Sequence, residues 1–131
     1  MQISSDSRPY YERIGGEDGV RRLVHRFYQL MDSMPEAKGI RDMHEDLAEA
    51  EERLFMFFSG WMGGPKLYIE KYGHPRLRMR HMPFSIGNDE SRQWMLCMGR
   101  ALDETVKDEA LREELKADFY KIADFMRNQA D

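Results

Sequence analysis

The sequence contains little of what several common classes of protein require. It has one cysteine, Cys97, so no disulfide can form within the chain. No apolar run approaches the roughly 20 residues of a membrane-spanning helix. The N-terminal segment MQISSDSRPYYERIGG lacks the apolar stretch of a signal peptide. We therefore expect a cytoplasmic protein that does not enter membranes.

The chain also lacks the positive charge of a nucleic-acid-binding protein. Its 20 basic residues are outnumbered by 24 acidic ones, and the formal net charge of −4 provides no basic stripe along which phosphates could bind. The one basic cluster, Arg76, Arg78 and Arg80, suits a small anionic ligand better than a polymer. With 131 residues, 41% of them hydrophobic, the chain has the size and composition of one folded domain.

Hydrophobic periodicity predicts an all-α fold. Apolar residues recur at the spacing of helix faces, and no segment shows the alternation with period two that marks a strand. No internal repeat or low-complexity linker divides the chain. We expect four long helices joined by short connections, over about residues 17–33, 46–61, 88–106 and 108–128.

The first two of these helices have well-defined apolar faces. The face of the helix over 17–33 consists of Val20, Leu23, Val24, Phe27, Leu30 and Met31. The face of the helix over 46–61 consists of Leu47, Ala50, Leu54, Phe57, Phe58 and Trp61. Asp46 and Glu49 have the spacing of a capping box, in which each side chain bonds a free backbone N–H. After the glycines at 63 and 64 the chain is expected to be irregular. Between Pro75 and Pro83 there is room for only a short helix of about two turns.

The four histidines, at positions 25, 44, 74 and 81, are the candidate metal ligands. Zinc sites favour closely spaced ligands, whereas the closest pair here, His74 and His81, is seven residues apart with a proline between them. His81 follows Leu77 by four positions, so the two share one face of the short helix. This setting suits a neutral imidazole bound to haem iron, with Arg78 and Arg80 placed to meet the haem propionates. The competing interpretation is a solvated basic turn.

The motif GHPRLRMRHMPF at residues 73–84 closely resembles the stretch through the proximal histidine of group II truncated haemoglobins. The glycine pair at 15–16, Phe27-Tyr28, the AEERL string at 50–54, Gly63-Gly64-Pro65, Tyr68 and Trp94 also match, so the resemblance extends from about Tyr10 to Met126. It implies one truncated globin domain over residues 1–131, in which a two-over-two helical sandwich surrounds haem. Residues 1–9 are expected to be a loosely ordered N-terminal extension.

The resemblance also implies roles for individual residues. His81 matches the proximal iron ligand of haem b. Tyr28 and Trp94 match distal positions, and His44 falls in the connection where relatives carry tyrosine, phenylalanine or histidine. The propionates are expected to meet Tyr68, Arg78 and Arg80. The full set of expected haem contacts is Phe27, Ala50, Leu54, Phe57, Tyr68, Leu77, Arg78, Arg80, Phe84, Ile86 and Met98.

Each distal side chain has an ordinary interpretation when the resemblance is set aside. Trp94 is then a core residue, Tyr28 a helix tyrosine with its hydroxyl at the surface, and His44 an exposed loop residue. What the three share is a group able to donate a hydrogen bond, and such donors stabilise the negative charge that dioxygen gains on ferrous haem. With the resemblance, we expect these donors to slow the release of dioxygen.

The expected function is therefore reversible binding of dioxygen or another diatomic gas at a five-coordinate haem iron. Slow release makes a poor carrier, so a haem redox enzyme acting on peroxide or nitric oxide is the main alternative. Either function implies a reductase that keeps the iron ferrous. A haem-based sensor and a helical interaction domain without cofactor are less favoured alternatives. We expect a monomer or a weak homodimer.

Overall fold

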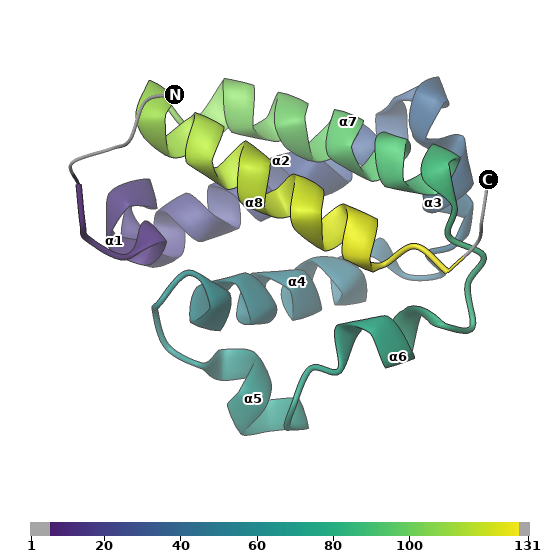
Figure 1. Ribbon diagram of the computed structural model, residues 1–131, viewed down its shortest axis with the longest axis horizontal. Helices are drawn as coiled ribbons and strands as arrows, with labels where there is room; N and C mark the ends of the chain where they lie inside the picture. The colour runs from purple at the N-terminus through teal and green to yellow at the C-terminus, as the bar shows by residue number, and fades with distance from the viewer. Residues whose placement is uncertain (1–5, 129–131) are drawn as a thin grey trace.

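The computed structural model describes residues 6–128, apart from the side chain of Arg78. Within this part of the chain the regular structure is helical and contains no strand, as predicted for the all-α class. The long helices are α2 (Gly16–Ser33), α4 (Leu47–Trp61), α7 (Asn88–Thr105) and α8 (Glu109–Phe125). Helix α2 packs on α4 and α7, and α7 packs on α8, which gives the predicted two-over-two arrangement (Figure 1).

Shorter helices connect the long ones. They are α1 (Tyr10–Ile14), the 3₁₀-helix η1 (Pro35–Ala37), α3 (Lys38–Asp42), α5 (Leu67–Tyr72) and α6 (Leu77–His81). Only α6 was predicted, and with five residues it is shorter than the expected two turns. Helices of this length complete too few turns for a hydrophobic repeat to appear. None of the helices in residues 6–128 is long and apolar enough to span a membrane.

Helix α2 lies at the centre of the core. Its predicted apolar face is confirmed, because all six of its residues are almost fully buried. Each buried side chain of this kind contributes about 1.5–3 kcal/mol to stability. The chain turns sharply from α1 into α2 at Gly15 and Gly16, whose φ angles of 106° and 68° lie in the left-handed region that glycine adopts without strain.

Helix α4 departs from prediction in two ways. Asp46 caps it, since its Oδ1 accepts a hydrogen bond from the Glu49 N–H (3.1 Å), but the Glu49 carboxylate pairs with Arg53 (3.1 Å) and does not complete the box. Of the predicted apolar face, only Phe58 is fully buried, where it stacks on Phe119 of α8 with 4.9 Å between ring centroids. The rest of the face is partly exposed and forms an apolar stripe along α4.

The C-terminal end of the domain was predicted less accurately than its centre. Helix α8 ends at Phe125, before the predicted end, because Asn128 bonds to the backbone at Ile86 and cannot continue the helix. Residues 1–5 of the predicted N-terminal extension lie outside the described part of the chain. Asp6 in the remainder forms ion pairs with Arg8 (2.8 Å) and Arg13 (3.5 Å).

Candidate haem site

The predicted proximal ligand, His81, lies at the end of α6 and is partly buried. Its Nδ1 donates a hydrogen bond to the backbone carbonyl of Leu77, one helical turn earlier (2.6 Å). A carbonyl only accepts, so this bond fixes a proton on Nδ1, and in the neutral ring the lone pair is then on Nε2. A neutral imidazole held in one tautomer is the form that binds haem iron.

The backbone that follows His81 is held by Asn128, from the end of the described chain. The Asn128 side chain donates to the carbonyls of Phe84 (2.8 Å) and His81 (3.3 Å) and accepts from the N–H of Ile86 (2.9 Å). Its own N–H donates to the carbonyl of Ile86 (2.8 Å). Asn128 thus fixes the path from the ligand-bearing helix to α7. No sequence pattern pointed to it, because a single asparagine after a helix has no periodicity.

The three predicted distal residues come together from three different elements. Tyr28 of α2 contacts His44, in the connection before α4, with 5.9 Å between ring centroids. Phe27, beside Tyr28, lies 5.4 Å by the same measure from Trp94 of α7. Tyr28 and Phe27 themselves pack edge to face at 4.9 Å. The contacts therefore run from Trp94 through Phe27 to Tyr28 and on to His44, so the three polar side chains belong to one cluster.

The polar atoms of this cluster are only partly used by the protein itself. His44 Nδ1 donates to the carbonyl of Ile40 (2.7 Å), which leaves Nε2 available. Within residues 6–128, neither the Tyr28 hydroxyl nor the Trp94 indole N–H has a hydrogen-bond partner. The Tyr28 side chain as a whole is 7% exposed, but its unpaired hydroxyl is not among the fully enclosed polar atoms of the described residues, so the hydroxyl is accessible to a bound ligand.

Burial sets the charge state of two of these groups. It raises the pKa of the Tyr28 hydroxyl, helped by the negative charge of Glu51, so the hydroxyl keeps its proton. Burial also lowers the pKa of His44, the bond to the Ile40 carbonyl opposes this in part, and the positive charge of Arg41 acts in the same direction as burial. A neutral His44 with its proton on Nδ1 presents Nε2 as an acceptor, in contrast to the predicted donor.

The expected haem contacts divide into buried and accessible groups. Ala50, Leu54 and Phe57 belong to the partly exposed stripe of α4, and Leu77 shares the face of His81 on α6. Phe84 is the most exposed of the apolar contacts. The remaining apolar contacts, which are buried, are Phe27, Ile86 and Met98.

The expected propionate contacts also lie together. The Arg80 guanidinium is 5.9 Å from the centroid of the buried Tyr68 ring, and its Nε donates to the carbonyl of Pro75 (2.8 Å). This leaves the outer edge of an exposed guanidinium free to meet a carboxylate. The side chain of Arg78 lies outside the described part of the structure, so its contact stays a prediction.

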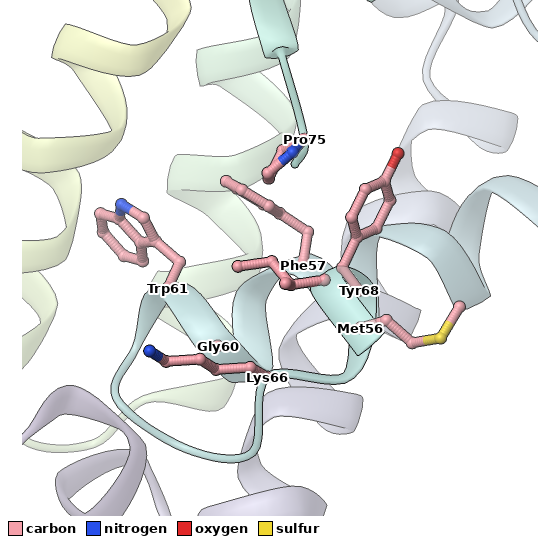
Figure 2. Close-up of a pocket in the computed structure, with 8 residues that line it drawn as sticks. Met56, Phe57, Gly60, Trp61, Lys66, Tyr68 and Pro75 are labelled. Carbon is pink, nitrogen blue, oxygen red and sulfur yellow. The ribbon is translucent and has the colours of Figure 1, made fainter. Parts of the chain in front are cut away.

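A small apolar pocket lies between α4 and α5, beside these residues. Its volume is about 140 Å³, and it shares Phe57 and Tyr68 with the expected haem contacts. Figure 2 shows the Lys66 side chain running alongside Gly60 at one edge of it. A pocket of this size suits a small apolar molecule rather than a porphyrin. Its lining consists of Met56, Phe57, Gly60, Trp61, Lys66, Tyr68, Ile69 and Pro75.

The donor set fits haem. In the described residues, no group of three or more His, Cys, Asp or Glu side chains is placed to hold a metal ion. A single neutral imidazole suits an iron whose other ligands come from a macrocycle, and the apolar stripe of α4 suits the face of a porphyrin. Arg80 and Tyr68 suit its carboxylates. Together with the helical arrangement, these features define a globin of the two-over-two type.

Comparisons with known proteins agree with this class. A family model described as bacterial-like globin matches residues 9–128. Group 2 truncated hemoglobin YjbI of Bacillus subtilis (strain 168) is 38% identical over 121 residues, which cover 92% of this chain and 89% of that protein. The chain therefore belongs to the bacterial-like globin family, and within it to the group II truncated haemoglobins, which confirms the resemblance seen in its sequence. Membership makes haem its cofactor.

Solved structures show the same relationship. The cold-adapted truncated hemoglobin from the Antarctic marine bacterium Pseudoalteromonas haloplanktis TAC125 matches with a TM-score of 0.92 and 45% identity, over 94% of this chain and 100% of that one. The group II 2-on-2 hemoglobin from the plant pathogen Agrobacterium tumefaciens matches with a TM-score of 0.91 and 44% identity, over 98% of this chain and 100% of that one. The fold is thus shared along nearly the whole chain.

Proposed function

We propose that this protein binds dioxygen reversibly at a five-coordinate haem b iron whose axial ligand is His81. The observation that carries the proposal is the 2.6 Å bond from His81 Nδ1 to the Leu77 carbonyl, which orients the ring and leaves Nε2 as the nitrogen that can bind iron. Haem supplies an iron with one open position that takes a diatomic gas. A solved structure from Bacillus subtilis, 37% identical to this chain, is described as an oxygen-avid haemoglobin, which supports dioxygen as the ligand.

Slow release is assigned to two donors, Tyr28 and Trp94. Both carry an N–H or O–H group that is not used elsewhere in residues 6–128, and both contact Phe27. Because the cluster is largely buried, donors there interact more strongly with a charged ligand than they would in water. Each donor is expected to contribute about 1–2 kcal/mol to holding dioxygen, or roughly tenfold in the release rate.

His44 takes a different role from the one that its sequence position suggested. Its ring is held by Ile40 through Nδ1, and its lowered pKa favours the neutral form. Nε2 then carries the lone pair. We propose that the His44 ring, packed edge to face on the Tyr28 ring at 5.9 Å between centroids, positions Tyr28 by contact, while the single hydrogen of the Tyr28 hydroxyl stays available to dioxygen.

Oxygen equilibrium and release measurements on the reduced, haem-loaded protein test this proposal. Rapid mixing of the oxygen-bound protein with excess carbon monoxide measures the release rate. We expect saturable, fully reversible binding and release much slower than from a Tyr28→Phe/Trp94→Phe double variant. Absence of a stable oxygen complex, together with steady consumption of peroxide well above that by free haem, would support the redox alternative instead.

A further inference from the structure

The segment that immediately precedes His81 has an unbalanced positive charge. Residues 66–80 contain five basic side chains and a single acidic one, Glu70, for a formal charge of +4. The whole chain carries −4, so the remainder carries −8. Residues 66–80 are therefore positive on balance, and the rest of the chain is negative on balance. The positive segment lies at α5 and α6, below α4 in Figure 1.

These cations are not neutralised by the protein. Of the eleven arginines outside residues 66–80, ten form an ion pair with a carboxylate, and Arg22 is the exception. Inside the segment, Lys66, Lys71, Arg76 and Arg80 pair with no carboxylate of residues 6–128. The charge of Lys66, Lys71 and Arg76 is therefore available to an external partner, whereas Arg80 is assigned to a haem propionate.

Exposed apolar side chains gather in the same segment. Of the eight large apolar side chains that are exposed in the described residues, five lie between Ile69 and Phe84. Met79 and Met82 are each 57% exposed. At 100° per residue they lie on the side of α6 opposite to the face shared by Leu77 and His81, so haem bound by His81 would leave them accessible.

We propose that this surface docks an acidic protein that donates single electrons, and we define the α5–α6 surface as Ile69, Lys71, Tyr72, Arg76, Met79 and Met82. The inference rests on the proposed function, because dioxygen binding needs ferrous iron. At each encounter the donor protein loses one electron and the ferric iron gains it. Methionine and aromatic residues beside unpaired cations are typical of transient interfaces, in which charge steers the approach.

Two features of the fold favour a protein partner. Met79 of this surface lies on the outer side of α6, the helix that bears His81, so a donor docked over it lies close to the expected ligand of the iron. An anionic membrane would also attract these side chains, but a helix that lies in a membrane surface is normally longer and continuous. Here α5 has six residues and α6 has five, and a turn through Arg76 (φ 47°) separates them.

The test compares two charge-reversal variants of the haem-loaded protein. Lys71→Glu/Arg76→Glu changes the α5–α6 surface. Arg22→Glu/Lys107→Glu makes the same change in net charge at a groove where α2 meets the corner between α7 and α8, and so controls for general repulsion. The probe is an acidic bacterial flavodoxin in its fully reduced form, mixed rapidly with ferric protein under carbon monoxide, which captures the ferrous product.

We expect the bimolecular reduction rate of the Lys71→Glu/Arg76→Glu variant to be about tenfold below that of the control variant at low ionic strength. High salt should remove most of this difference, since it screens exposed charges. Reduction by dithionite should not distinguish the variants. Equal rates with flavodoxin at low ionic strength would overturn the proposal.

A binding measurement that involves no electron transfer completes the test. Oxidised flavodoxin is titrated into isotope-labelled, carbon monoxide-bound protein, and the amide signals of residues 67–82 are expected to shift. Shifts confined to another surface would overturn the proposal, as would binding to phosphatidylglycerol vesicles without binding to flavodoxin. Failure of the proposed function is distinguishable, because it would appear beforehand as an absence of haem uptake or of dioxygen binding.

Discussion

Replacing Tyr28 with phenylalanine removes one hydroxyl group and leaves the aromatic ring in place. The ring contacts with Phe27 (4.9 Å) and His44 (5.9 Å) are retained. In residues 6–128 the hydroxyl has no hydrogen-bond partner, so the substitution breaks no bond within the protein itself. Its effect should therefore fall on the bound ligand and not on the fold.

The expected magnitudes differ between the two properties. If the hydroxyl donates to dioxygen, its loss costs the complex about 1–2 kcal/mol, and dioxygen should leave roughly tenfold faster. The haem-free protein should be about as stable as before, because the hydroxyl makes no bond within the described residues and is not fully enclosed, so its removal leaves no group unpaired. Faster release without loss of stability is the signature of a side chain kept for function.

Two assays measure these quantities. Rapid mixing of the oxygen-bound protein with carbon monoxide gives the release rate, and urea unfolding of the haem-free protein gives its stability. An unchanged release rate would refute the donor role of Tyr28. A loss of more than about 2 kcal/mol of unfolding free energy would show that the hydroxyl stabilises the fold, contrary to the structure.

Three further predictions follow from the same contacts. Trp94→Phe keeps an aromatic ring between Phe27 and Phe119 but removes the indole N–H, so dioxygen release measured by the same mixing experiment should rise roughly tenfold. Asn128→Ala frees the backbone after His81 and should speed haem transfer to apomyoglobin several-fold, whereas an exposed-site control, Lys121→Ala, should not. The pKa of His44 is lowered in the folded protein from its ordinary value of 6.5. As the pH falls, His44 is therefore protonated in the unfolded chain before it is protonated in the folded one, which favours unfolding. Wild type should therefore lose more unfolding free energy than His44→Phe between about pH 7.5 and pH 5.5, and equal losses in urea unfolding would contradict this assignment.

The long helices could be predicted because their faces repeat over several turns. Helix α2 has 18 residues, and every apolar position of its predicted face is buried. Helices α1, α3 and α5, with five or six residues each, provide no comparable repeat. The face of α4 was predicted correctly as apolar, but periodicity alone does not distinguish a face that meets other helices from one that meets a cofactor.

The candidate site residues could be predicted from the sequence, but their hydrogen bonds could not. The motif around His81 predicts the ligand, and the distal positions of Tyr28 and Trp94 are predicted from the same resemblance. The bond from Asn128 to Ile86 joins residues 42 positions apart and depends on where α8 ends. The acceptor role of His44 likewise depends on the Ile40 carbonyl, which the short helix α3 brings within 2.7 Å of Nδ1.

The central claim is that His81 is the axial ligand of a haem iron with an open position opposite. The most direct test is the absorbance spectrum of the ferrous protein before and after carbon monoxide, for wild type and for His81→Ala. We predict a Soret band that shifts with carbon monoxide in wild type, is lost or greatly reduced in His81→Ala, and returns when imidazole is added. The account would be contradicted if wild type and His81→Ala gave the same spectra without imidazole, or if wild type took up no haem.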